Sequence, residues 1–288
     1  MRYIGALPDV HWFAGRRLAD ALPGGGLWRC KCCGFAFRHP LLPLERYEEL
    51  YRQGGLGVWD GHEHREDFRL IRDYLAPSQG QSLDVLDIGC YTGDLLTSLP
   101  RSFRIFGVEA NAEAAKRATA RGVSIVAETV EAFSGTDRKF DVITACDVIE
   151  HVPRPLEFLA ILGSHVRPGG RVIVTTGDCD AWLWRLVGAG YWYCYFAEHI
   201  SFVGSRWVSD MPTRAGLRLT SLTHFNSLGG RIGVARLAAT ALARWAPSLF
   251  RVVRRSLLPA SDADEVPPGR GASRDHLFGV FETVRSSG

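Results

Sequence analysis

The stretch Val85-Leu86-Asp87-Ile88-Gly89-Cys90-Tyr91-Thr92-Gly93-Asp94 decides the fold class of this chain. An apolar run ends in an acid, two glycines follow, and a helical pattern begins at Asp94-Leu95-Leu96. This order predicts a buried parallel strand, a tight turn and the N-terminus of a helix. Because glycine has no Cβ, a ligand can touch the main chain at such a turn. The start of the helix adds free N–H groups and a partial positive charge.

The residues around the turn favour a ligand that carries positive charge. A phosphate-binding loop would end in Gly-Lys followed by Ser or Thr, whereas this turn ends in Gly93-Asp94. A dinucleotide fold prefers Gly-x-Gly-x-x-Gly, and the acids Asp87 and Asp94 would repel its pyrophosphate. S-adenosylmethionine has a sulfonium and an ammonium group, so it fits these acids better than a nicotinamide dinucleotide does.

Two further segments continue the same pattern. Ile105 to Val108 is a second short apolar strand, and it ends at Glu109-Ala110, about twenty residues after the first. An acid at this place hydrogen-bonds the ribose of an adenosine cofactor, and both of its oxygens can accept. Helical spacing runs from Ala112 to Ala120, and a third strand is expected at Val123 to Val126. That strand leads to Glu128-Thr129, where adenine would lie.

The polar cluster Asp147-Val148-Ile149-Glu150-His151 follows a fourth buried strand that begins at Phe140. In open α/β sheets, ligands bind at the carboxyl ends of the strands, so this cluster faces the predicted site. After a helix, the turn Pro168-Gly169-Gly170 precedes a fifth strand. Residues 217–225 and 275–282 have the pattern of a sixth and a seventh strand.

Together these motifs resemble those of the Rossmann-like S-adenosylmethionine-dependent methyltransferases, in the branch with a "DVIEHVP"-type fourth motif. That branch includes the ubiquinone-biosynthesis O-methyltransferases. The resemblance covers about Tyr47 to Val284, and Tyr91 departs from it because the family usually has glycine there. It implies an α/β fold: a seven-stranded, mostly parallel, doubly wound sheet whose antiparallel last strand lies between the fifth and sixth. The cofactor residues that it implies are Asp87, Gly89, Cys90, Tyr91, Gly93, Glu109, Ala110, Glu128, Thr129 and Asp147.

The candidate catalytic residues are His151 and His199, since methyl transfer to oxygen or nitrogen can need a base. Each could equally be a histidine held for structural reasons. Asp147, Glu150, His151 and His199 also resemble the acid-x-x-Glu-His set, with a distant His, of some metal-assisted O-methyltransferases. The same letters occur in relatives that need no metal, and we predict no metal here.

Residues 1–45 form a predicted small N-terminal module, and residues 46–288 form the methyltransferase domain. Cys30 and Cys33 are spaced C-x-x-C and Gly34 follows, as in one knuckle of a zinc ribbon. No second cysteine pair lies upstream, and Cys32, His11 or His39 would complete a tetrahedral site only with unusual spacing. We therefore predict a degenerate knuckle that keeps its fold without metal.

Composition limits the partners. The chain has 288 residues, a formal net charge of +3 and seven cysteines. It has no dense basic stripe with interleaved aromatic residues, so no nucleic-acid partner is expected. The absence of a hydrophobic leader and of a long apolar run predicts a reduced, cytoplasmic protein. Residues 231–258 predict a basic helical insertion, for which weak contact with an anionic membrane surface and a solvated packed face are both open.

The acceptor is the least determined part. The aromatic residues between Ala181 and Phe202 could line an acceptor pocket, form core, or contribute to a homodimer. Tyr47 and Tyr51 could cover the cofactor or merely pack, because they are four residues apart on a predicted helix. The prediction is methyl transfer from S-adenosylmethionine to a small-molecule or glycan-type acceptor, at oxygen. The alternatives are a non-catalytic cofactor-binding protein, a nucleic-acid methyltransferase and, least favoured, a nicotinamide oxidoreductase.

Overall fold

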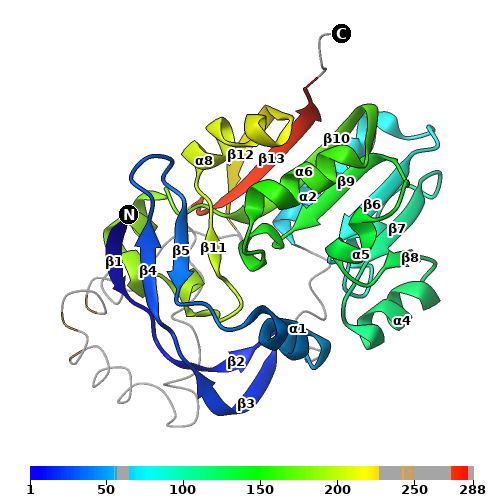
Figure 1. Cartoon of the computed structure of the whole chain (residues 1–288). Coiled ribbons are helices and arrows are strands. Elements are labelled where there is room, and N and C mark those ends of the chain that lie inside the picture. The colour runs from blue at the N-terminus through cyan, green and yellow to red at the C-terminus, as the bar shows by residue number, and fades with distance from the viewer. Residues whose placement is uncertain are drawn as a thin grey trace.

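The computed structural model describes residues 1–54, 56, 65–226, 242, 246, 249 and 274–284. Its larger sheet has seven strands in the order β12-β13-β10-β9-β6-β7-β8 (Figure 1). In chain order these strands are β6 (Asp84–Ile88), β7 (Arg104–Val108), β8 (Ser124–Ala127), β9 (Phe140–Cys146), β10 (Val166–Gly177), β12 (Leu217–Phe225) and β13 (His276–Thr283).

The directions of these strands confirm the predicted fold class. Strands β8, β7, β6, β9 and β10 pair in parallel. Strand β13 lies between β10 and β12 and is antiparallel to both. The last strand is therefore inserted between the fifth and the sixth strands of the sheet, as the resemblance implied.

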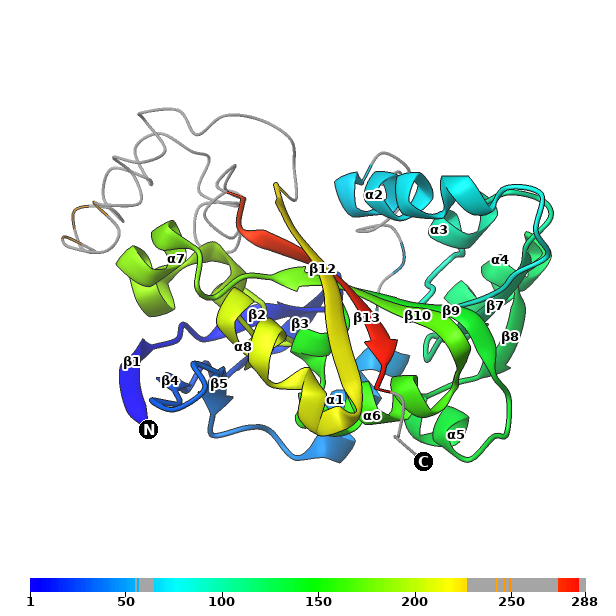
Figure 2. The same cartoon turned by 90° about the horizontal axis from the view of Figure 1, so that it is seen from above.

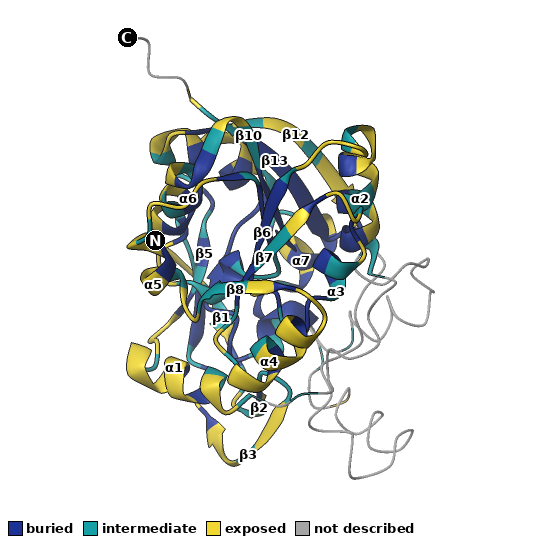
Figure 3. Cartoon of the chain, turned by 90° about the vertical axis from the view of Figure 1, so that its right-hand side faces the viewer, coloured by how far each residue is buried: buried dark blue, intermediate teal, exposed yellow. Residues whose placement is uncertain are grey.

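Helices cover both faces of this sheet (Figure 2). Helices α2 (Glu66–Leu75), α3 (Asp94–Thr97) and α4 (Ala112–Ala120) pack on one face, and α5 (Val130–Ser134), α6 (Pro155–Ser164) and α8 (Ser205–Asp210) pack on the other. Because successive side chains of a strand point to opposite faces, neighbours on β9 such as Val142 and Ile143 enter different cores. Figure 3 shows the central strands buried between helices whose outer sides are exposed.

One predicted boundary is wrong. The Pro168-Gly169-Gly170 segment is not a separate turn before the fifth strand but lies inside β10. Val166 already pairs with Phe140 of β9, and the register shifts before Arg171 pairs with Val142. Gly169 has a φ of +83°, so the segment is an irregularity of the strand that glycine can adopt.

The N-terminal segment builds a second, four-stranded sheet in the order β1-β4-β5-β11 (Figure 1). Its strands are β1 (Arg2–Ala6), β4 (Gly26–Arg29), β5 (Ala36–His39) and β11 (Ser201–Phe202), and β2 (Val10–Phe13) and β3 (Arg16–Leu22) form a hairpin. Helix α1 (Leu44–Arg52) follows. Since β11 comes from the second half of the chain, residues 1–45 share a sheet with the segment that carries His199. The boundary at residue 45 stays a prediction.

Short elements connect β10 to β12. They are α7 (Trp182–Val187), the 3₁₀ turns η3 (Gly188–Gly190) and η4 (Trp192–Tyr195), β11, α8 and η5 (Pro212–Ala215); η1 (Ala76–Ser78) and η2 (Ile149–His151) lie earlier. Most of the aromatic residues here are core: Trp184, Tyr191, Trp192 and Tyr193 are buried together with Leu27 and Ala36 of the N-terminal sheet. Trp182 is an exception, with 57% of its surface exposed.

The predicted basic insertion, 231–258, lies outside the described residues except for three single positions. The membrane contact predicted for it therefore stays a prediction. Within the part of the chain that the structure describes, no helix has the length and apolar character needed to cross a bilayer.

Candidate active site

The predicted site residues, apart from His199 in the segment before β11, lie at the carboxyl ends of neighbouring strands. Strand β6 pairs with β7 on one side and with β9 on the other, and β8 lies beyond β7. The loops after these strands therefore meet along one edge of the sheet. They carry Asp87, Gly89, Cys90, Tyr91 and Gly93 (β6), Glu109 and Ala110 (β7), Glu128 and Thr129 (β8), and Asp147 and His151 (β9).

Glu109 ties the β6 turn to the end of β7. Its Oε2 accepts the main-chain N–H of Tyr91 at 2.8 Å, and its Oε1 accepts the N–H of Asn111 at 2.8 Å. Tyr91 adopts a left-handed conformation with a φ of 47°, which costs roughly 1–2 kcal/mol for a residue other than glycine. The Glu109 hydrogen bond therefore helps to explain how tyrosine is held where the family has glycine.

Two predicted cofactor side chains are engaged within the protein. The thiol of Cys90 lies under the turn, because a Cβ on Gly107 would come within 2.4 Å of it. The hydroxyl of Thr129 accepts the N–H of Ala132 at 3.2 Å and so caps α5. These two residues can face a cofactor only with their main chain, and their assignment to the site stays a prediction, as does that of exposed Glu128.

The two acids that flank the turn, Asp87 and Asp94, lie in different surroundings. Asp94 forms an ion pair with Arg121, so its charge is balanced. Asp87 is buried and accepts the hydroxyl of Thr144 at 2.6 Å. Burial raises the pKa of Asp87 to about 7, although the bond from Thr144 opposes this. Of the two acids on which the preference for a positively charged ligand was based, Asp94 is thus paired and Asp87 is partly protonated near neutral pH, and that preference stays a prediction.

Sequence reasoning missed Arg65 and Asp67, which come from the start of α2. Arg65 Nη2 lies 2.7 Å from Asp147 Oδ2 and also binds Asp67. Asp147 has a left-handed φ of 52°, and its Oδ1 is buried without a hydrogen-bond partner among the described residues. A buried carboxylate oxygen without a partner is costly unless a ligand donates to it. A cationic donor, such as the ammonium group of S-adenosylmethionine, would satisfy this oxygen.

His151 and His199 lie side by side, with ring centroids 4.9 Å apart. His151 Nδ1 is 2.8 Å from the hydroxyl of Tyr51 and 3.1 Å from the carbonyl oxygen of Glu198. His199 Nδ1 is 2.9 Å from the carbonyl oxygen of Tyr193. Removal from water lowers the pKa of both imidazoles, so both are neutral at neutral pH.

Glu150, His151 and His199 offer ligand atoms within 4.8 Å of one another, and in the part of the chain that the structure describes they are the one group that could hold a metal. Both oxygens of Glu150 are already used, because they accept the hydroxyls of Tyr193 and Thr176. Asp147 faces Arg65 instead. The four-residue set that the sequence suggested is thus not assembled as a ligand set, and the absence of metal stays our prediction.

The cysteine turn has the main-chain shape of a knuckle. Between β4 and β5, Cys30 N–H donates to Phe35 O at 2.7 Å, and Gly34 N–H donates to Cys30 O at 3.1 Å. Hydrogen bonds from the main chain of Cys33 and Cys32 lower the pKa of Cys30 to about 7. Among the described residues no third metal ligand joins this pair in a compact group. A knuckle without metal stays our prediction for this turn.

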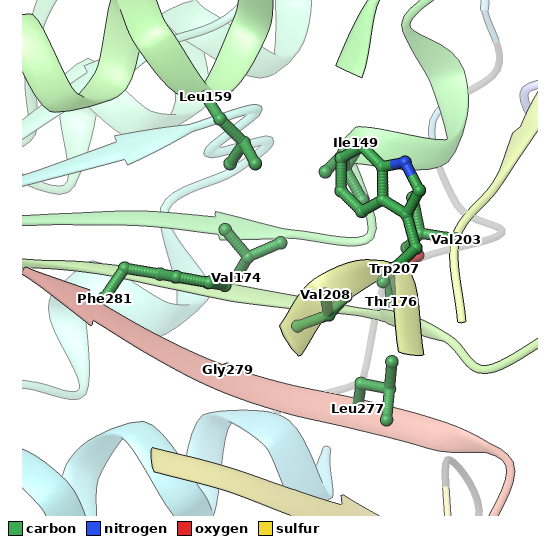
Figure 4. Close-up of a pocket in the computed structure, with 10 residues that line it drawn as sticks. All are labelled: Ile149, Leu159, Val174, Thr176, Val203, Trp207, Val208, Leu277, Gly279 and Phe281. Carbon is green, nitrogen blue, oxygen red and sulfur yellow. The ribbon is translucent and has the colours of Figure 1, made fainter. Parts of the chain in front are cut away.

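The cavity in Figure 4 does not provide an acceptor pocket. It has a volume of about 10 Å³, enough for at most one water molecule. It lies between the sheet and α6 and α8, and its lining is apolar apart from Thr176: Ile149, Leu159, Val174, Val203, Trp207, Val208, Leu277, Gly279 and Phe281. It is a packing defect of this core.

Comparison with known proteins assigns the chain to a family. The family model described as "Methyltransferase domain" matches residues 61–222. The chain belongs to this methyltransferase family. Over 186 residues, this chain is 30% identical to the ubiquinone biosynthesis O-methyltransferase of Serratia proteamaculans. The aligned region covers 56% of this chain and 77% of that protein. The protein of the same name from Pectobacterium atrosepticum is 31% identical over 172 residues, covering 52% and 71%.

Solved structures show the same fold. The methyltransferase in complex with the Haloferax volcanii Trm112 activator has a TM-score of 0.52 at 13% identity, covering 79% of this chain and 97% of that one. The N-methyltransferase NodS from Bradyrhizobium japonicum, bound to S-adenosyl-L-homocysteine, has a TM-score of 0.50 at 16% identity, covering 83% and 98%. The methyltransferase described here is an S-adenosylmethionine-dependent enzyme.

Proposed function

We propose that this methyltransferase transfers a methyl group to the hydroxyl of a small-molecule acceptor, with His151 as the base. The observation that carries the proposal is the pair of neutral imidazoles, His151 and His199, 4.9 Å apart beside Asp147 at the carboxyl edge of the sheet. Transfer to oxygen agrees with the relatives, which are called O-methyltransferases.

The cofactor would lie across the ends of β6, β7 and β9. Glu109 would accept the ribose hydroxyls with its remaining lone pairs, since each of its oxygens takes one main-chain N–H. Asp147 Oδ1 would accept the ammonium group, while Arg65 holds the other oxygen of this carboxylate. The bound sulfonium supplies an activated methyl group, so the protein has to position the acceptor and remove its proton.

His151 is suited to the second task. A neutral imidazole can take a proton from an acceptor hydroxyl as the methyl group is transferred. His199, whose ring centroid is 4.9 Å from that of His151, is the alternative base. The acids Asp147 and Glu198 stabilise the imidazolium that forms, because each raises the pKa of His151 against the effect of burial. Acidic surroundings also disfavour an acceptor with a strongly negative reacting end.

Labelled methyl transfer to a panel of phenolic and sugar-like acceptors tests the proposal. We expect His151→Asn to lower kcat by about 10²–10⁴-fold, the usual worth of a general base. Its affinity for S-adenosyl-L-homocysteine should stay close to that of the wild type, because His151 is not placed at the cofactor. His199→Asn is the matched variant, because it removes the neighbouring imidazole and leaves His151 in place. Full turnover in His151→Asn, or labelling of amines alone, would refute the proposed mechanism.

A further inference from the structure

Helix α1 of the N-terminal segment brings the hydroxyl of Tyr51 to the imidazole of His151. The two atoms, Oη and Nδ1, are 2.8 Å apart, and the two rings meet edge to face with centroids 5.9 Å apart. We propose that Tyr51 is a positioning residue for His151, one that keeps Nδ1 protonated and leaves Nε2 to take the acceptor's proton. This inference rests on the proposed role of His151 as the base.

The direction of the hydrogen bond follows from the second partner of Nδ1. That partner is the carbonyl oxygen of Glu198, at 3.1 Å, and a carbonyl oxygen can only accept. We therefore assign the hydrogen to Nδ1, so that the oxygen of Tyr51 accepts the same hydrogen in a three-centre bond. A neutral imidazole protonated on Nδ1 has its lone pair on Nε2, which is the form that a base requires.

The N-terminal segment holds this arrangement at two points. The ring of Tyr51 packs edge to face on Phe13 of β2, with centroids 4.9 Å apart. The main-chain N–H of Ala14, in the turn of the β2–β3 hairpin, donates to Glu198 Oε1 at 3.1 Å. The same hairpin therefore contacts both Tyr51 and Glu198, the two residues whose oxygen atoms lie next to His151 Nδ1. On the cofactor side, Asn111 donates to the carbonyl oxygen of Gly54, just beyond α1, at 3.1 Å.

The hydrogen bond matters most during turnover. When His151 takes up the acceptor's proton it becomes an imidazolium, and its Nδ1–H bond to Tyr51 becomes a bond from a charged donor. Such bonds are about twice as strong as neutral ones. Loss of the Tyr51 hydroxyl should therefore slow the chemical step by roughly ten- to a hundredfold, with little effect on cofactor binding.

The test compares Tyr51→Phe with Tyr47→Phe. Both tyrosines lie on α1 and both pack on Phe13, but the structure gives Tyr47 no contact with His151. We expect a fall in kcat in Tyr51→Phe alone, with the KM for S-adenosylmethionine unchanged in both. We also expect the NMR proton resonance of the His151 Nδ1–H, assigned by its loss in His151→Asn, to move upfield in Tyr51→Phe only.

Equal kcat values in the two tyrosine variants, or an unmoved Nδ1–H resonance, would overturn the role of Tyr51. If His151→Asn is inactive in the same assay, the proposed function survives that result. If His151→Asn keeps its turnover, the proposed base is wrong and the role of Tyr51 fails with it. The variants therefore separate failure of this inference from failure of the function on which it rests.

Discussion

Glu150 shows how the buried acids of this site are held. It is 1% exposed, and its two oxygens accept the hydroxyls of Tyr193 and Thr176. Burial, together with the negative charge of Asp147, raises the pKa of Glu150 to about 8. Its carboxyl is therefore neutral in the folded protein at pH 7, so the site can contain several acids without the repulsion that their number suggests.

This pKa predicts a pH dependence of stability. In the unfolded chain Glu150 ionises near its ordinary value of 4.5, whereas in the folded protein it ionises near 8, so folding takes up a proton between these values. Its contribution to stability is complete below pH 4.5 and is lost as the pH rises through 8. Glu150→Gln removes the titration, so the Tm of the variant minus that of the wild type should increase from pH 5 to pH 9. A constant difference would contradict this.

Gly89 should be needed for both stability and cofactor binding. Its φ is +71°, and a Cβ there would lie 3.0 Å from Val148 Cγ2. Gly122, with a φ of +94° and nothing within 4 Å, is the matched control. We expect both alanine variants to lose roughly 1–2 kcal/mol of unfolding free energy, measured in urea. Only Gly89→Ala should also lose affinity for S-adenosyl-L-homocysteine; equal affinities in both variants would place the cofactor elsewhere.

The segment between η4 and β11 shows how an element of the site is fixed. Arg38 of β5 is 3% exposed and has no hydrogen bond to an acid in the described residues. Its guanidinium donates instead to carbonyl oxygens of Gly24, Cys194, Phe196 and His199, at 2.6–3.2 Å. The guanidinium of Arg38, from the N-terminal sheet, thus holds the main chain of the loop that carries His199.

Replacement of Arg38 by methionine should therefore be severe. It keeps much of the buried volume but leaves four carbonyl oxygens without this donor, and each such buried group costs about 1–3 kcal/mol. We expect a loss of at least about 3 kcal/mol in urea unfolding, with Arg38→Lys intermediate because it keeps a charge and fewer donors. A loss below about 1 kcal/mol would show that the loop does not depend on this clamp.

Most strands and turns of the larger sheet could be predicted because their signals are local; the Pro168-Gly169-Gly170 turn is the exception. The predicted helix at 112–120 and strand at 217–225 coincide with α4 and β12. Arg38 and Arg65 could not be predicted as site residues, and the contact of Tyr51 with His151 could not be predicted either. The role of each depends on a hydrogen-bond partner far away in the sequence: the longest such separation is 161 positions for Arg38, 100 for Tyr51 and 82 for Arg65. A buried arginine also has no spacing pattern of its own in the sequence. Long-range polar contacts of this kind require the fold to be known first.

The smaller sheet joins residues on the two sides of the predicted boundary at residue 45. Strand β11 pairs with β5, and the carbonyl oxygen of Ile200 accepts the N–H of Arg38 at 2.9 Å. The N-terminal strands also share a core with α7 and η4. We propose that residues 1–45 complete the methyltransferase domain rather than forming an independent module.

That proposal predicts a single cooperative unfolding transition for the whole chain in differential scanning calorimetry. The calorimetric enthalpy should equal the van't Hoff enthalpy, and Arg38→Met should shift the entire transition to lower temperature. Two separable transitions, with only one of them moved by this substitution, would mean that the N-terminal segment folds by itself.

The position of the methyl donor is the central claim, and it depends on Glu109 at the end of β7. Isothermal titration calorimetry with S-adenosylmethionine should show binding to the wild type and to Glu113→Ala, which changes an exposed acid in the first turn of α4. Glu109→Ala, checked for native circular dichroism, should bind about tenfold more weakly or worse. Equal affinity in the two variants would contradict the placement of the cofactor at this edge of the sheet.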